Sequence, residues 1–109
     1  MGVDVVLTRV TRRGTSPAKR QLTTVGVVQD EADLFAGLCV SSRLPMLNRV
    51  DPYRTRVLTS ADMPQFIAEI DATGGLVEGP RERSLLARIR ELAERCAEAG
   101  SLELHLHGD

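Results

Sequence analysis

Four side chains that can bind metals or carry protons lie at alternate positions near the C-terminus. The stretch LELHLHGD, residues 102–109, places Glu103, His105, His107 and Asp109 at odd positions and leucines between them. Because side chains of an extended strand alternate between its two faces, these four would share one face. Paired imidazoles of this kind bind zinc when a third ligand arrives from elsewhere. The same alternation is also typical of a half-buried strand whose polar face meets solvent or a partner protein.

Few other groups for catalysis or metal binding are present. His105 and His107 are the only histidines, so a metal site would need a carboxylate such as Asp4 or Asp51. No nucleophile elbow, phosphate-binding loop or dinucleotide-binding glycine pattern occurs. We therefore predict no catalytic residue, no bound metal and no cofactor. A small metal- or histidine-dependent enzyme that uses Glu103, His105 and His107 remains an alternative.

A basic segment near the N-terminus could contact phosphates or an acidic partner. Its cations are Arg9, Arg12, Arg13, Lys19 and Arg20, and glycine, serine and proline between them indicate a loop. Such a segment can bind the phosphates of a nucleic acid. The net charge of −1 and the lack of any nucleic-acid-binding signature argue against that partner. A nucleic-acid-associated regulator is therefore kept only as a second alternative.

A proline turn carries residue types that often anchor protein interfaces. The segment VDPYRTR, residues 50–56, holds the only tyrosine, Tyr53, next to Arg54 and Arg56. Pro52 would present these side chains on a rigid turn, although Tyr53 could instead pack into the core beneath it. We predict a partner-binding surface made of Tyr53, Arg54, Arg56, Glu103, His105 and His107.

Length and composition fit one small domain. The chain has 109 residues, of which 42% are apolar and only three are aromatic, so a single core would be mainly aliphatic. Residues 1–59 carry nine basic and five acidic groups, a charge of +4, and residues 60–109 carry five basic and ten acidic groups, a charge of −5. This asymmetry predicts two surfaces of opposite charge, unless the two halves interleave in space.

The cysteines and the N-terminus indicate a cytoplasmic protein. Cys39 and Cys96 fall on apolar faces of predicted helices, which favours buried free thiols over a disulfide framework. No apolar run approaches the length of a membrane span. In residues 1–14 the basic groups follow the apolar ones, the reverse of a secretory signal. We therefore expect no membrane partner.

Hydrophobic periodicity predicts an α+β fold. Strands are expected at 3–10, 22–28 and 101–107, with a broken or edge strand at 45–50 and a short extended piece at 56–59; helices are expected at 30–39, 60–72 and 80–99. Asp30, either Ser60 or Asp62, and Pro80 supply the helix starts, while Gly74 and Gly100 supply stops. We predict that residues 1–109 form one antiparallel sheet of about four strands, with two or three helices packed on one face.

The second half of the chain resembles a family of small uncharacterised bacterial proteins. The shared features are an Asp-Pro-Tyr turn, a threonine or asparagine entering a helix, a second amphipathic helix and a strand ending in Gly-Asp. They match DPYRTRVLTSADMPQFIAEI and LLARIRELAERCAEAGSLELHLHGD within residues 50–109, with Arg54 and Thr55 where the family pattern has Gly-Asp. The resemblance implies a compact binding protein of the immunity type, meaning a cognate inhibitor of a bacterial toxin, and implies no enzymatic activity.

Small size, the lack of a catalytic set and the acidic second half favour one functional interpretation. We predict a non-catalytic protein-binding module, of the immunity or antitoxin type, whose charge would speed association with its partner. Self-association into a homodimer through an edge strand is compatible with this interpretation.

Overall fold

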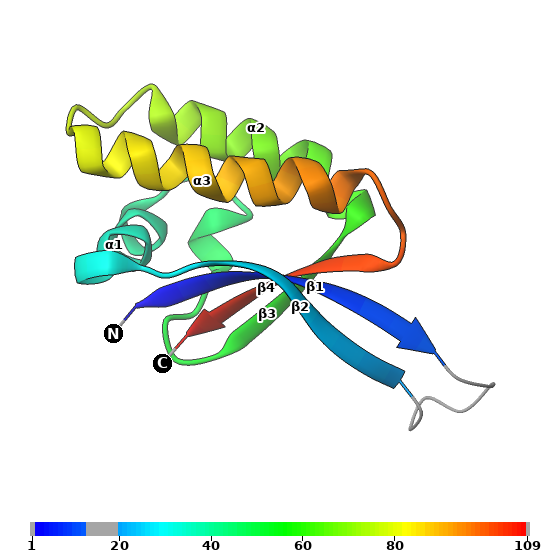
Figure 1. The fold of residues 1–109 in the computed structure, drawn as a ribbon. Coiled ribbons are helices and arrows are strands. Elements are labelled where there is room, and N and C mark those ends of the chain that lie inside the picture. The colour runs from blue at the N-terminus through cyan, green and yellow to red at the C-terminus, as the bar shows by residue number, and fades with distance from the viewer. Residues whose placement is uncertain (1, 13–19, 109) are drawn as a thin grey trace.

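A four-stranded antiparallel sheet carries all three α-helices on one of its faces (Figure 1). This computed structural model describes residues 2–12 and 20–108. The strands are β1 (Val3–Arg12), β2 (Arg20–Val28), β3 (Thr55–Thr59) and β4 (Leu102–Gly108), and the helices are α1 (Leu34–Ser41), α2 (Met63–Gly74) and α3 (Pro80–Ala97). The predicted α+β architecture is therefore confirmed.

The last strand in the sequence lies in the middle of the sheet. The strand order is β2-β1-β4-β3, so β4 is hydrogen-bonded to β1 on one side and to β3 on the other. His105 is aligned with Val6 of β1 and with Val57 of β3. The residues that the sequence singles out near the C-terminus therefore lie at the centre of the sheet.

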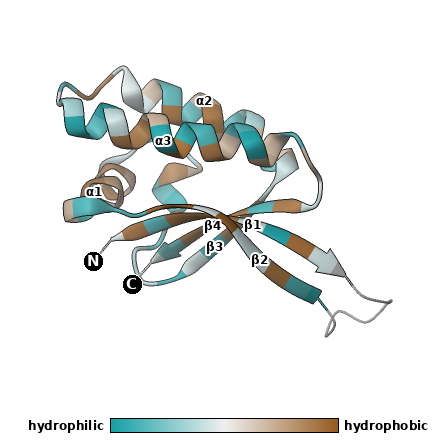
Figure 2. Cartoon of the chain, in the orientation of Figure 1, coloured by the Kyte–Doolittle hydropathy of each residue, from teal (hydrophilic) through white to brown (hydrophobic). Residues whose placement is uncertain are grey.

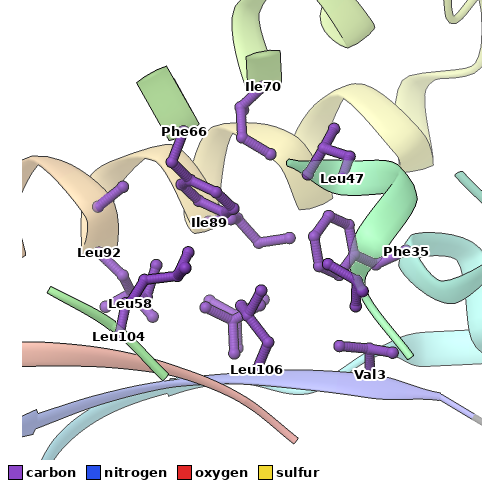
Figure 3. Close-up of a cluster of buried hydrophobic side chains, with 14 of the residues drawn as sticks. Val3, Phe35, Leu47, Leu58, Phe66, Ile70, Ile89, Leu92, Leu104 and Leu106 are labelled. Carbon is purple, nitrogen blue, oxygen red and sulfur yellow. The ribbon is translucent and has the colours of Figure 1, made fainter. Parts of the chain in front are cut away.

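An aliphatic core fills the space between the sheet and the helices (Figure 3). The sheet contributes Val3, Val5, Leu7, Leu58, Leu104 and Leu106, and the helical layer contributes Phe35, Phe66, Ile70, Ile89 and Leu92, among others. In Figure 2 polar and apolar residues alternate along α2 and α3, whereas α1 is apolar over most of its length. The leucines of β4 are buried as their alternation predicts, because their face is the one that the helices cover.

The start of α1 is held by Asp30, four residues before the helix begins. Its carboxylate accepts hydrogen bonds from the backbone N–H groups of Phe35 at 2.7 Å, Ala36 at 2.8 Å and Val3 at 2.9 Å. Asp30 therefore binds the first N–H groups of α1, but it does so from outside the N-cap position, which Asp33 occupies, because the helix begins later than predicted. Residues 31–33 form a 3-10 turn in which Ala32 and Asp33 have φ values of 54° and 57°, outside the right-handed helical region.

The prediction of a broken or edge strand at residues 45–50 is wrong. This segment forms a turn and a short 3-10 helix, Leu47–Arg49, which contacts α1 and is hydrogen-bonded to α2. The buried carboxylate of Glu69 accepts hydrogen bonds from the backbone N–H groups of Met46 at 3.0 Å and Leu47 at 2.9 Å. Because these two donors point at a carboxylate on α2, they cannot form a strand ladder.

The two long helices begin and end close to their predicted positions. A reciprocal capping box between Thr59 and Asp62 precedes α2, so the capping hydroxyl is that of Thr59 and not of Ser60. The apolar positions of α3 are buried as predicted, except for Ala97 at its end. No helix in residues 2–12 and 20–108 has the length and apolar character needed to cross a membrane.

An arginine on α3 ties the two long helices together at their exposed surface. Arg90 Nε lies 2.7 Å from Oδ1 of Asp71 on α2, and Arg90 also pairs with Glu94 one turn further along α3. Hydrogen bonding from Arg90 lowers the pKa of Asp71. Because both side chains are largely exposed, this pair contributes little to stability.

Candidate functional site

The face of the sheet opposite the helices, which we call the open face, has no covering element in residues 2–12 and 20–108 (Figure 1). Strand register aligns four residues across it, one from each strand: Val27, Val6, His105 and Val57. We call these four residues the apolar row. Val27 is 50% exposed and Val57 is 46% exposed. The two edge strands of the row therefore present half-exposed valine side chains to solvent, and between them Val6 and the buried His105 occupy the inner strands.

Polar residues border the apolar row on both sides. One bordering set consists of Thr24, Thr8, Glu103 and Thr59, and the other consists of Asp4, His107 and Thr55. Alternation along β1, β3 and β4 places their members on the same face as the apolar row. In β2 the register shift opposite Leu7 and Thr8 brings Thr24 to that face. The open face therefore has an apolar centre between two polar margins, which is the composition of many protein interfaces.

His105 is buried although it lies on the open face. Its exposure is 7%, because it is flanked by Val6 and Val57 across the strands and by Glu103 and His107 along its own strand. The expectation that Glu103, His105 and His107 are all displayed to solvent is therefore wrong for His105, and the other two are only partly exposed. Long-range strand pairing on both sides of β4 is the physical reason, and it cannot be inferred from alternation within one strand.

The side chains around His105 form a short polar chain across the sheet. Its Nε2 lies 3.0 Å from Oε1 of Glu103, and Glu103 also forms an ion pair with Arg20 of β2. The His105 and His107 ring centroids are 5.8 Å apart, and Nδ1 of His107 lies 3.1 Å from Oγ1 of Thr55. These contacts fix the side-chain orientations in advance of any binding event.

The geometry offers limited means for catalysis or metal binding. Among residues 2–12 and 20–108, no three His, Cys, Asp or Glu side chains lie close enough together to hold a metal ion. Asp109, the last member of the predicted row, lies outside the described residues. Glu103 occupies Nε2 of His105, and the imidazole ring is buried. A histidine-dependent activity remains a prediction without a reactive partner group in this part of the chain.

The Asp-Pro-Tyr turn lies beside the end of β4. The N–H of Gly108 donates to the carbonyl of Arg54 at 2.9 Å, and a Cβ at Gly108 would overlap the backbone of Asp51 and Pro52. Of the predicted partner-binding residues, Arg54 and His107 therefore lie at this end of the sheet, whereas Glu103 is aligned with Thr59 at the other end. Arg56 alternates with Thr55 and Val57, so it lies on the opposite side of β3 from the open face. Tyr53 is 66% exposed, so the alternative in which it packs into the core is wrong.

The basic segment is described only in part. Arg13 and Lys19 lie outside the described residues, whereas Arg9 is exposed on β1 and Arg20 pairs with Glu103. One of the cations assigned to phosphate contact is thus already paired with a carboxylate. The structure adds no support for the nucleic-acid alternative.

Two features of the site escape a reading of the sequence. The apolar row combines residues from all four strands, so its members are recognised only when the strand order is known. The pairing of Arg20 with Glu103 joins positions 83 residues apart.

A scan against protein-family models and searches of curated proteins and of solved structures found no match to this chain.

Proposed function

We propose that the chain is a non-catalytic, cytoplasmic protein-binding module that docks on a partner protein with the open face of its sheet. An immunity or antitoxin-type inhibitor, which works by covering the active site of a toxin, fits this mode of action. The observation that carries the proposal is the placement of exposed apolar side chains. Of the six large ones in the described residues, three lie on the open face: Leu22, Val27 and Val57.

The chemistry of the open face supports a protein partner. A central apolar strip that loses water on binding, bordered by threonine, histidine and carboxylate groups, matches the core and rim of a typical interface. Regular strands and the contacts of Glu103 hold these side chains in place before binding. Little conformational entropy is then lost on association, which favours tight binding.

A second apolar surface on the helical layer provides an internal control. A cavity of about 440 Å³ lies between the end of α1 and the end of α2, and its lining includes Leu38, Leu44 and Leu76. Leu76 is 82% exposed and follows directly after the end of α2. A substitution there adds the same charge as one on the open face and leaves the sheet unchanged.

The experiment measures how the parent chain and the variants Val57→Glu and Leu76→Glu bind the products of genes that neighbour the chain's own gene. Each product is mixed with the untagged chain, and complex formation is measured by calorimetry and by size-exclusion chromatography with light scattering. We expect one product to bind in a defined stoichiometry and to lose its activity in the complex. Val57→Glu should weaken binding by about tenfold or more, because a charge buried in the apolar row is left without a partner.

Three outcomes would overturn the proposal. The first is that no neighbouring product binds while the chain alone remains a monomer. The second is that Leu76→Glu abolishes binding and Val57→Glu does not. In the third, the chain alone is a dimer that Val57→Glu dissociates, so the open face serves self-association and not the inhibition of a partner.

A further inference from the structure

Three arginines surround a cavity where the Asp-Pro-Tyr turn enters β3. The cavity has a volume of about 270 Å³ and is lined by Arg49, Asp51, Arg54, Thr55 and Arg56. We call it the arginine cavity. Three guanidinium groups and one carboxylate give its lining a formal charge of +2. It adjoins one end of the sheet and includes no member of the apolar row.

Within the part of the chain that the structure describes, Arg49 and Arg56 of the arginine cavity have no paired carboxylate. The single ion pair within the lining joins Arg54 Nε to Asp51 Oδ2 at 3.7 Å, and Oδ1 of Asp51 accepts a hydrogen bond from the N–H of Tyr53 at 2.8 Å. The side chains of Arg49 and Arg56 have no hydrogen bond or ion pair with any residue that the structure describes. Clustered like charges repel one another, and a bound anion would relieve that repulsion.

The backbone that carries these arginines is firmly held. Arg49 ends the 3-10 helix whose first N–H groups bind Glu69. The carbonyl of Arg54 accepts a hydrogen bond from the N–H of Gly108, and the N–H of Arg54 donates one to the carbonyl of Asp51 at 3.1 Å. Arg56 belongs to β3 and is aligned with Leu106 of the central strand. Three fixed attachment points for long cationic side chains therefore converge on one volume.

We propose that the arginine cavity binds a phosphoryl group, either inorganic phosphate or the phosphate of a small organic monoester. A guanidinium presents a planar fork of N–H donors that matches two oxygens of a phosphate. The formal charge of +2 balances a phosphate dianion, whereas a carboxylate would balance only half of it. Thr55 also lines the cavity, but its hydroxyl already contacts Nδ1 of His107, so the arginines are the anion-binding groups of the lining. This proposal does not depend on the protein-binding role of the open face.

The test is a titration of the full chain at constant ionic strength, followed by calorimetry and by backbone amide NMR. The probes are inorganic phosphate, phenyl phosphate, acetate and a short single-stranded oligonucleotide. We expect both phosphate probes to bind one site and to shift amides of residues 49–56. Arg49→Gln and Arg56→Gln should each raise the dissociation constant about tenfold, because each removes a charged hydrogen-bond donor.

Arg88→Gln is the matched control, since Arg88 is an exposed arginine of α3 that lies outside the cavity lining. It removes the same charge and should leave phosphate binding within about twofold of the parent, far less than the loss of a direct contact. Thermal melting of all three variants verifies that they fold.

Three results would overturn the proposal. Arg88→Gln could weaken binding as much as Arg56→Gln does, which would indicate general screening. Acetate could bind as tightly as phosphate. The oligonucleotide could bind with a steep salt dependence while the small phosphates do not, which would assign the arginines to nucleic-acid contact.

Discussion

Nε2 of His105 lies 3.0 Å from Oε1 of Glu103, and this pair belongs to the central strand on a sheet face that no helix in residues 2–12 and 20–108 covers. The imidazole is buried by strand neighbours, so the pair organises the open face instead of reaching into solvent. Because Glu103 also pairs with Arg20, one carboxylate links β4 to the edge strand β2. The residues that look most like a catalytic set in the sequence thus lie in a chain of polar contacts on the open face.

Zinc should have no specific effect on this protein. His105 and His107 are the only histidines, and no third metal ligand joins them within the described residues. We expect the melting temperature of the untagged chain to stay the same when zinc is added in slight excess, because a ligand stabilises a fold only through binding it. Stoichiometric stabilisation that His107→Ala removes would contradict this expectation and restore the metal interpretation.

Removing the carboxylate of Glu69 should destabilise the fold strongly. Glu69→Ala leaves the buried N–H groups of Met46 and Leu47 without an acceptor, and each unsatisfied group costs about 1–3 kcal/mol. We expect the free energy of unfolding, measured with urea, to fall by about 2–4 kcal/mol.

Glu91→Ala is the control for Glu69→Ala, since Glu91 is exposed on α3. It should change the free energy of unfolding by no more than about 0.5 kcal/mol. If the two variants were equally stable, the segment containing Met46 and Leu47 would not be anchored by Glu69.

Alkaline pH should destabilise the protein through its buried thiols. Burial raises the pKa of Cys39 to about 12 and that of Cys96 to about 11, and neighbouring carboxylates add to both increases. In the unfolded chain a thiol titrates near pH 8.5, so the folded state holds its protons to higher pH. The contribution of these thiols to the free energy of unfolding is complete below about pH 8.5, and it is lost as the pH rises through their pKa values in the folded protein.

Urea unfolding at pH 7 and at pH 10 measures this effect. The unfolding free energy should be lower at pH 10, and a Cys39→Ala, Cys96→Ala double variant should lose much of that difference. In the native parent at pH 8, a thiol reagent should label neither cysteine until the protein is unfolded, because the reactive thiolate is scarce and covered. Rapid labelling of the folded protein would contradict the assigned burial.

Local patterns in the sequence were sufficient to predict the elements that depend on near neighbours. The alternation of leucines in residues 102–106 and the apolar spacing of Leu85, Ile89 and Leu92 identified β4 and α3, since the side-chain period differs between strands and helices. The same reasoning failed at residues 45–50. There the deciding group is Glu69, which bonds to backbone donors 22 and 23 residues earlier in the chain.

The candidate site was predicted only in part, for a related reason. Alternation placed Glu103, His105 and His107 on one face but could not show that β4 is a central strand. The neighbours that bury His105, Val6 and Val57, are set by the strand order β2-β1-β4-β3, which depends on pairing between distant segments. The apolar row therefore became visible only with the sheet assembled.

The central claim is that the open face contacts the partner, and valine methyl NMR with a soluble paramagnetic probe tests it most directly. Val27 and Val57 report on the open face, and Val40, which is 65% exposed on α1, reports on the helical layer within the same sample. In the complex with the partner, we expect the methyl groups of Val27 and Val57 to become protected from the probe while those of Val40 remain as accessible as in the free chain. Protection of Val40 with continued access to Val27 and Val57 would contradict the account.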